Sequence, residues 1–297
     1  MPLIQFKYVL NNGRSCGVLL SCPTASADDR CLLPNMCSPI VPWGATPFCV
    51  SNVFAVAGTQ GFSRRLPLQS IYTSNQYAEL NPTWHEEDSP WKAKQIAEII
   101  ARNNLTFTSL CEVGCGTGEI LLNLSRSHPL AKFDGYEVAP NAYQRARLKT
   151  TDNVSFHLKD ILSDQTVRYD VLVVADVIEH VEDYISFIKG LRPLARYKIF
   201  HIPLDLSVQS VIRGWPITNL RRNVGHIHYF FKETALATLH DCGYSVVDHM
   251  YTPSRIELPN QAFTSKLMSF PRKLFYPLNP DLTVRILGGY SLLVLAE

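Results

Sequence analysis

From residue 89 onward, the hydrophobic positions follow two alternating periods. Ser89-Pro90 opens a segment with Trp91, Ile96 and Ile100 on one face, which predicts a helix with proline in its first turn. Short apolar runs then alternate with helical segments. The run Tyr169–Ala175, Val-Leu-Val-Val at its centre, is typical of a strand buried on both faces.

The predicted strands are Ser109–Val113, Ala131–Glu137, Val154–Leu158, Tyr169–Ala175, Lys198–Ile202, Tyr244–His249 and Tyr290–Ala296. The predicted helices between them are Glu119–Arg126, Asn141–Lys149, Glu182–Leu194 and Lys232–Cys242, the last ending at Gly243. Such alternation predicts an α/β fold with a mainly parallel sheet and helices on both faces. The last two strands, separated by a long insertion, are expected to form an antiparallel edge.

Residues 1–70 show no sustained hydrophobic period and are rich in Pro, Ser, Cys and Gly. We therefore predict a loop-rich or disordered N-terminal extension, followed by a catalytic domain over residues 71–297. Five of the eight cysteines lie in this extension without a CxxC pair, which favours reduced thiols over a zinc site.

The composition argues against some classes of binding partner for this protein. Hydrophobic residues make up 46% of the chain and the formal net charge is +2, so nothing favours DNA as a partner. No apolar run reaches the ~20 residues that span a bilayer, and the N-terminus lacks a good signal peptide. A cytoplasmic protein is expected.

One glycine-rich segment carries the strongest chemical signal. Glycines 114, 116 and 118 connect the strand Ser109–Val113 to the helix that begins at Glu119. They let the backbone turn tightly and approach a ligand. The spacing is GxGxG, whereas a dinucleotide site expects GxGxxG and a phosphate at the helix N-terminus. Glu119 would repel that phosphate, so a ligand without phosphates fits better than NAD.

Acidic residues recur where the predicted strands end. Glu112 could accept a hydrogen bond from a ligand ammonium, and Glu137 could accept both hydroxyls of a ribose. Asp160, followed by Ile161, lies where an adenine is expected, and Asp176 lies beside the reacting centre. Ligands of open α/β sheets bind at these carboxyl ends.

These segments resemble the class I S-adenosylmethionine (SAM)-dependent methyltransferases. The resemblance is carried by residues 112–118, 135–140, 158–160 and 169–181. Residues 225–230, before the helix that ends at Gly243, resemble the tail of ubiquinone-type and related small-molecule methyltransferases. The resemblance covers about residues 77–297. It implies a Rossmann-like sheet of seven strands with an antiparallel last strand, and SAM as methyl donor bound by Glu112, Gly114, Gly116, Gly118, Glu137, Asp160, Ile161 and Asp176.

Methyl transfer from a sulfonium needs positioning, and a general base helps when the acceptor is a hydroxyl. The candidate bases are His180, His201, His226 and His228. Alternatively, Asp176, Glu179 and His180 with His226 or His228 would form an oxygen-and-nitrogen cation site. That spacing resembles an acidic motif of small-RNA 2′-O-methyltransferases and of ubiquinone-pathway O-methyltransferases, with Asp in place of Glu; no metal is assigned.

Two segments are expected to contact the acceptor. Residues 204–225 carry Arg213, Trp215, Arg221 and Arg222, which suit a phosphate or carboxylate. Residues 253–285 interleave basic and apolar positions, as in a lid or a helix on a membrane surface, with Pro271 and Pro277 interrupting a long helix. Tyr77, Trp84, His85 and Trp91 are expected to close over the cofactor.

The sequence therefore predicts methylation of a small-molecule acceptor, anionic or lipid-linked, on oxygen rather than nitrogen. Two alternatives stay open: an RNA 2′-O-methyltransferase, which the weak net charge disfavours, and a SAM-binding regulatory protein without catalysis.

Overall fold

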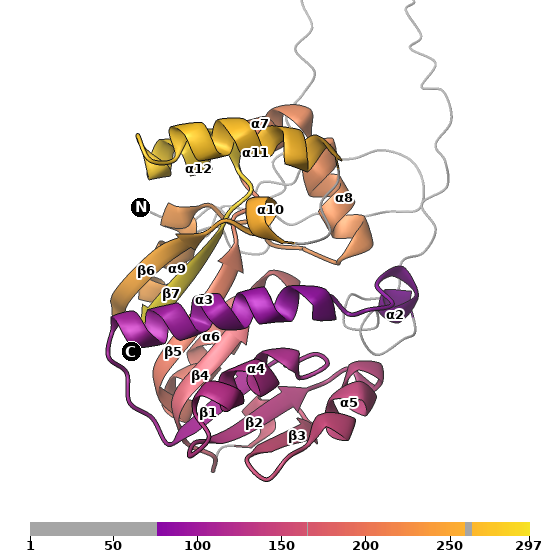
Figure 1. Cartoon of the computed structure of the whole chain (residues 1–297), viewed down its shortest axis with the longest axis vertical. Helices are drawn as coiled ribbons and strands as arrows, with labels where there is room; N and C mark the ends of the chain where they lie inside the picture. The colour runs from indigo at the N-terminus through magenta and orange to yellow at the C-terminus, as the bar shows by residue number, and fades with distance from the viewer. Residues whose placement is uncertain (1–75, 165, 259–262) are drawn as a thin grey trace, which may run out of the picture. The chain divides into compact units, whose positions relative to one another are not determined.

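The computed structural model describes residues 76–164, 166–258 and 263–297. The predicted extension over residues 1–70 lies outside the described residues. Those described form a seven-stranded sheet with the order β3-β2-β1-β4-β5-β7-β6 (Figure 1). The strands are β1 Ser109–Val113, β2 Lys132–Glu137, β3 Val154–Leu158, β4 Tyr169–Ala175, β5 Ala195–Pro203, β6 Val246–Thr252 and β7 Ser291–Ala296.

The five strands β3, β2, β1, β4 and β5 are mutually parallel, whereas β7 pairs antiparallel with both β5 and β6. The predicted antiparallel pair is therefore confirmed, with β7 inserted between β5 and β6. Strand order reverses direction between β1 and β4. In open α/β sheets the crevice at such a switch point is where ligands bind.

Helices cover both faces of the sheet, as predicted. They are α2 Gln76–Leu80, α3 Ser89–Arg102, α4 Glu119–Ser127, α5 Pro140–Ala146, α6 Tyr184–Leu191, α7 Val208–Arg213, α8 Trp215–Asn223, α9 Lys232–Asp241, α10 Ser254–Glu257, α11 Phe263–Phe275 and α12 Pro280–Leu287. Apolar side chains of α3 and α4 belong to one core cluster and those of α6 and α9 to the other.

Successive residues of β4 supply these two clusters in turn. Val171 and Val173 pack with α3 and α4, while Leu172 and Val174 pack on the opposite face. This alternation follows from the two-residue period of a strand. It explains why the central strand is apolar at every position from Val171 to Ala175 instead of alternating with polar residues.

Helices α7, α8, α10, α11 and α12 lie beyond the end of the sheet where β4 and β5 finish (Figure 1). The expectation that Pro271 interrupts its segment is wrong, because α11 runs through it to Phe275. A proline without an N–H removes one internal hydrogen bond, which surrounding contacts of a packed helix can offset. Within the described ranges, no helix is long and apolar enough to cross a bilayer.

Candidate active site

A cavity of about 1020 Å³ opens at the carboxyl ends of the parallel strands. Nearly all residues predicted to bind SAM or to act in catalysis line it. These are Glu112, Gly114, Gly116, Glu137, Asp160, Ile161, Asp176, His180, His201 and His226. Gly118 and the candidate base His228 do not belong to the lining.

The three glycines of the loop have different roles. All have positive φ values between 55° and 84°, a region that side chains rarely occupy. A Cβ at Gly114 would meet Val177 at 2.7 Å, and one at Gly118 would meet Phe156 at 2.4 Å. At Gly116 no described atom lies within 4 Å of that position. Gly118 therefore serves the turn and the packing, whereas Gly116 borders the open cavity.

Glu112, the penultimate residue of β1, is a buried carboxylate that lacks a hydrogen-bond partner in the described part of the chain for one of its oxygens. It is 1% exposed and its Oε2 has no hydrogen-bond partner among the described residues. Burial raises the pKa of Glu112 well above its usual value. A ligand cation in the cavity would supply the missing partner, which fits the ammonium of SAM.

Glu137, at the end of β2, is held by backbone donors. Its Oε2 accepts from the Gly116 N–H at 2.8 Å, and its Oε1 accepts from the N–H groups of Val138 and Ala139. These bonds occupy three of the roughly four lone-pair positions of a carboxylate. Glu137 therefore fixes the glycine loop, and accepting both ribose hydroxyls would require it to exchange one of these bonds.

The adenine side of the predicted site comes from the segment after β3. Asp160 is exposed and caps a short 3₁₀ helix by accepting from the Leu162 N–H at 2.9 Å. Ile161 is buried beside it and lines the cavity. The pair therefore offers one carboxylate and one apolar surface.

Asp176 is engaged by protein groups on both oxygens. Its Oδ2 lies 2.7 Å from Lys92 Nζ of α3, and its Oδ1 lies 2.7 Å from His201 Nδ1. Burial opposes the charge, but Lys92 and His201 outweigh it, so the pKa of Asp176 falls well below its usual value. Asp176 has a φ of 54°, an uncommon conformation that this pair of contacts helps to hold.

His201 has no ring nitrogen left for an acceptor. Its Nε2 lies 2.9 Å from Thr252 Oγ1, and its Nδ1 is bound to Asp176. The prediction of His201 as a base therefore needs correction, since Asp176 occupies its Nδ1 and Thr252 occupies its Nε2, in the chain of contacts Lys92–Asp176–His201–Thr252.

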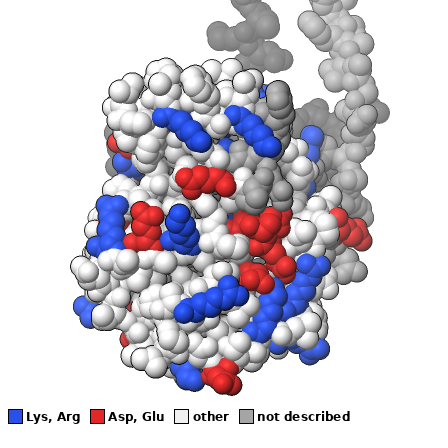
Figure 2. Space-filling model, viewed as in Figure 1, with Lys and Arg blue, Asp and Glu red and all other residues white. Residues whose placement is uncertain are grey.

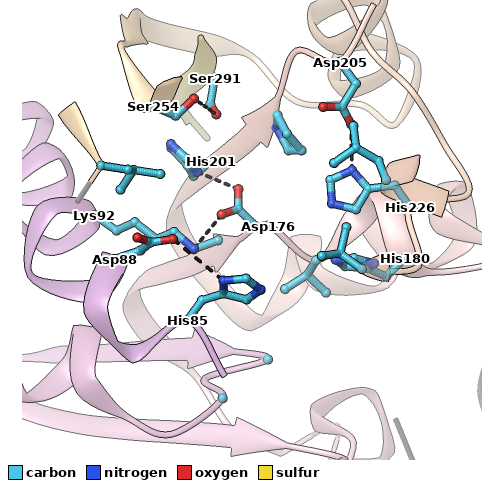
Figure 3. A pocket seen from close by; sticks show the side chains of 18 of the residues that line it. His85, Asp88, Lys92, Asp176, His180, His201, Asp205, His226, Ser254 and Ser291 are labelled. Carbon is cyan, nitrogen blue, oxygen red and sulfur yellow. Dashed lines mark hydrogen bonds and ion pairs between the residues drawn. The ribbon is translucent and has the colours of Figure 1, made fainter. Parts of the chain in front are cut away.

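His226 pairs with Asp205 (Figure 3), and its Nε2 lies 3.9 Å from Glu179 Oε1. Its Nδ1 lies 2.6 Å from Asp205 Oδ2, which favours a proton on Nδ1 and a lone pair on Nε2. Burial lowers the pKa of His226, but Asp205 and Glu179 outweigh this and raise it overall. The His226 Nε2 makes no hydrogen bond within the described part of the chain.

Glu179 and His180 lie against this imidazole. Glu179 is fully buried, and burial raises its pKa to about 8. Burial and the neighbouring His226 lower the pKa of His180 to about 3, so His180 is neutral at pH 7. Its ring contacts that of His226 edge to face at 4.8 Å between centroids.

The cation site suggested by the sequence is only partly assembled. Ligand atoms of Glu179, His180 and His226 lie within 4.8 Å of one another. Asp176 points to Lys92 and His201 instead, and His228 Nε2 contacts the carbonyls of Val181 and Glu182. The expected four-residue set is therefore wrong, although three residues remain together.

The segments expected to cover the ligands also line the cavity. Tyr77, Trp84, His85 and Trp91 do so from the region before and within α3, and Arg213 and Trp215 do so from α7 and α8. Arg221 and Arg222 are exposed and lie outside this lining.

The sequence analysis did not identify Lys92, which pairs with Asp176, or Asp205 and Thr252, which bind His226 and His201. Lys92 stands on the apolar face of a predicted helix, next to Trp91, and a charge at such a position is a usable signal. No pattern in the sequence marks Asp205 or Thr252, because they lie 21 and 51 residues from the histidines they contact.

Comparisons with known proteins agree with this geometry. A profile of the methyltransferase domain matches residues 84–249, more than half of the 297 residues. A ubiquinone biosynthesis O-methyltransferase of Xanthomonas oryzae pv. oryzae (strain PXO99A) is 25% identical over 182 residues, covering 55% of this chain and 75% of the relative. One from Xanthomonas campestris pv. campestris (strain B100) is 24% identical over 134 residues, covering 41% and 55%.

Solved structures share the fold. A complex of the Haloferax volcanii Trm112 methyltransferase activator with a methyltransferase aligns with a TM-score of 0.52 at 16% identity, covering 79% of this chain and 98% of that one. Magnesium protoporphyrin IX methyltransferase from Synechocystis PCC 6803, with bound SAH, aligns at 0.48 and 18% identity, covering 77% and 91%. The chain therefore belongs to the methyltransferase domain family, as a class I SAM-dependent methyltransferase.

Proposed function

We propose that this enzyme methylates a hydroxyl group of its acceptor, with His226 as the general base. The observation that carries the proposal is the Asp205–His226 pair at the cavity wall, in which a largely buried carboxylate fixes Nδ1 and leaves Nε2 without a hydrogen bond among the described residues. A hydroxyl must lose a proton during methyl transfer, and a positioned imidazole accelerates such a step about 10²–10⁴-fold. The relatives named as O-methyltransferases support oxygen as the acceptor atom.

The other residues of the cavity have proposed roles in binding and positioning SAM. SAM supplies a methyl group already activated by its sulfonium. Glu112 binds the ammonium, Gly116 gives the cofactor room, and Asp160 with Ile161 contacts the base end. Asp176, held by Lys92 and His201, presents a fixed negative charge at the end of β4. Trp84 and Trp91, which line the cavity, would shield this region from water.

The test is transfer of radiolabelled methyl from SAM to a panel of phenols, amines and RNA. We expect phenols to be the acceptors, and His226→Ala to lower kcat by about 10²-fold or more with little change in SAM affinity. His240→Ala, at an exposed position of α9, is the control. Transfer to amines or RNA, or a His226→Ala variant with normal kcat, would contradict the proposal.

A cation bound by Glu179, His180 and His226 is the alternative use of the same imidazole, and the grouping of their ligand atoms favours it. It predicts that the activity disappears with EDTA and returns with a divalent metal. Full activity in EDTA would leave His226 as a base.

We also propose that the acceptor is lipid-linked and that the enzyme binds it at a membrane surface. Helix α11 lines the cavity with Ser265 and Met268, while Leu267, Phe270 and Leu274 are 68%, 72% and 54% exposed on it. An apolar stripe beside basic residues suits an interfacial helix. Co-sedimentation with phosphatidylglycerol vesicles should therefore retain the wild type and lose Phe270→Asp, whereas equal retention would exclude this stripe as the contact.

A further inference from the structure

The cavity contains a second group of charged residues, distinct from the cofactor and base groups. Arg272 on α11, Arg255 on α10 and Arg213 at the end of α7 all line it. Ser254 and Ser291 also line it, and their hydroxyls lie 3.4 Å apart beside His201 (Figure 3). Three cations and two hydroxyls thus face the same space.

Arg272 is unusual because it is a buried cation. It is 4% exposed, and its Nε and one terminal nitrogen donate to the Leu287 carbonyl at 3.3 and 3.0 Å. Its other terminal nitrogen, Nη1, has no partner among the described residues. Leaving a donor of a buried charge unpaired is costly, so such groups usually have a ligand or a counterion.

The backbone is shaped to hold this guanidinium in place. Gly289 has a φ of 86°, and a Cβ there would lie 2.5 Å from the Arg272 Cζ. Only glycine therefore lets the guanidinium lie flat against the chain between α12 and β7. Together with the two bonds to Leu287, this contact fixes the direction of Nη1.

No carboxylate of the described residues forms an ion pair with Arg213, Arg255 or Arg272. Arg213 instead donates to Gln209 at 2.9 Å and packs over Trp215, and both Arg213 and Arg255 are exposed at the cavity. Burial lowers the pKa of Arg272, and the charges of Arg255 and Arg213 lower it further. Figure 2 shows acidic side chains at several separate places on this face of the molecule. Three consecutive ones, Glu86, Glu87 and Asp88, lie just before α3.

We propose that Arg272, assisted by Arg255 and Arg213, binds an oxyanion of the acceptor, a phosphate or a carboxylate. This inference rests on the proposed function, since the anion would orient the acceptor whose hydroxyl faces His226. A planar guanidinium suits the paired oxygens of either group. The anion would supply the partner that Nη1 lacks and relieve the repulsion among the three cations.

Thermal unfolding of the protein saturated with SAH tests this inference directly. Phenyl phosphate, benzoate and uncharged phenol are titrated at constant ionic strength. We expect at least one of the two anions to raise Tm at concentrations where phenol does not, and the more effective anion identifies the group as phosphate or carboxylate.

Arg272→Gln should raise the half-saturating concentration of that anion by about tenfold or more and leave SAH affinity unchanged. Arg221→Gln, an exposed arginine outside the cavity, is the matched control and should behave as wild type. If Arg272→Gln does not fold, the exposed Arg255→Gln variant decides, with an expected rise of about threefold.

Equal stabilisation by phenol and both anions would overturn the anion site, as would an unchanged titration in Arg272→Gln or, failing that, in Arg255→Gln. A wild-type protein that does not bind SAH at all would instead refute the proposed function. The two failures are therefore distinguishable in one experiment.

Discussion

At the scale of single residues, the two histidines of the site differ in what their second nitrogen contacts. His201 binds Asp176 and Thr252, so it serves as a spacer that keeps Asp176 in place. His226 Nδ1 binds Asp205, whereas its Nε2 lies 3.9 Å from Glu179 Oε1 and makes no hydrogen bond among the described residues. The two imidazoles therefore differ in whether the second ring nitrogen is hydrogen-bonded.

This difference gives a prediction for the pH dependence. The pKa of His226 is raised above 6.5, and a base must be unprotonated, so kcat should fall as the pH drops through that raised value. Asp205→Asn removes the negative partner and should therefore move this acidic limb to lower pH while lowering kcat. The measurement is kcat against pH for both proteins; an unmoved acidic limb would show that another group controls it.

At the scale of elements, the turn between β1 and α4 needs glycine for two different reasons, close packing and space for a ligand. Gly118 must be small because Phe156 occupies the space behind it, whereas Gly116 faces the open cavity. The same residue type is therefore required by the core at one position and by the ligand at the other.

A matched pair of variants separates these demands. Gly118→Ala should lower the free energy of unfolding by about 2–4 kcal/mol, because the new methyl overlaps Phe156 at a positive φ. Gly116→Ala should cost about 1–2 kcal/mol for its φ but weaken SAM binding at least tenfold. Chemical denaturation and SAM titration of both variants measure this, and the assignment is wrong if Gly118→Ala alone loses SAM affinity.

The pattern of hydrophobic residues was sufficient to predict the strands of the sheet, but not the short helices beyond its end. Strands β1, β3 and β4 lie at their predicted bounds, since strands buried between two helix layers are recognisable in the sequence as short apolar runs. Helices α7, α8 and α12 were not predicted, because they are short and expose residues such as Ile212 and Leu282. Contacts such as Asp205–His226 depend on the final arrangement of loops, which local sequence does not encode.

At the scale of the whole molecule, ligand binding should be visible as stability. A ligand at 100 times its Kd stabilises the folded state by about 2.7 kcal/mol, or roughly 5–10 °C in Tm for a domain of this size. We expect SAH to produce this shift and NAD to produce none. A shift with NAD alone would contradict the interpretation of the glycine loop.

The position of β7 has a consequence for how the protein is made. This strand is buried throughout and separates β5 from β6, yet it is synthesised after every other strand of the sheet. Until it leaves the ribosome, β5 has an open edge and β6 has no neighbour to pair with. Nascent chains stalled before residue 291 should therefore recruit chaperones or self-associate through that edge.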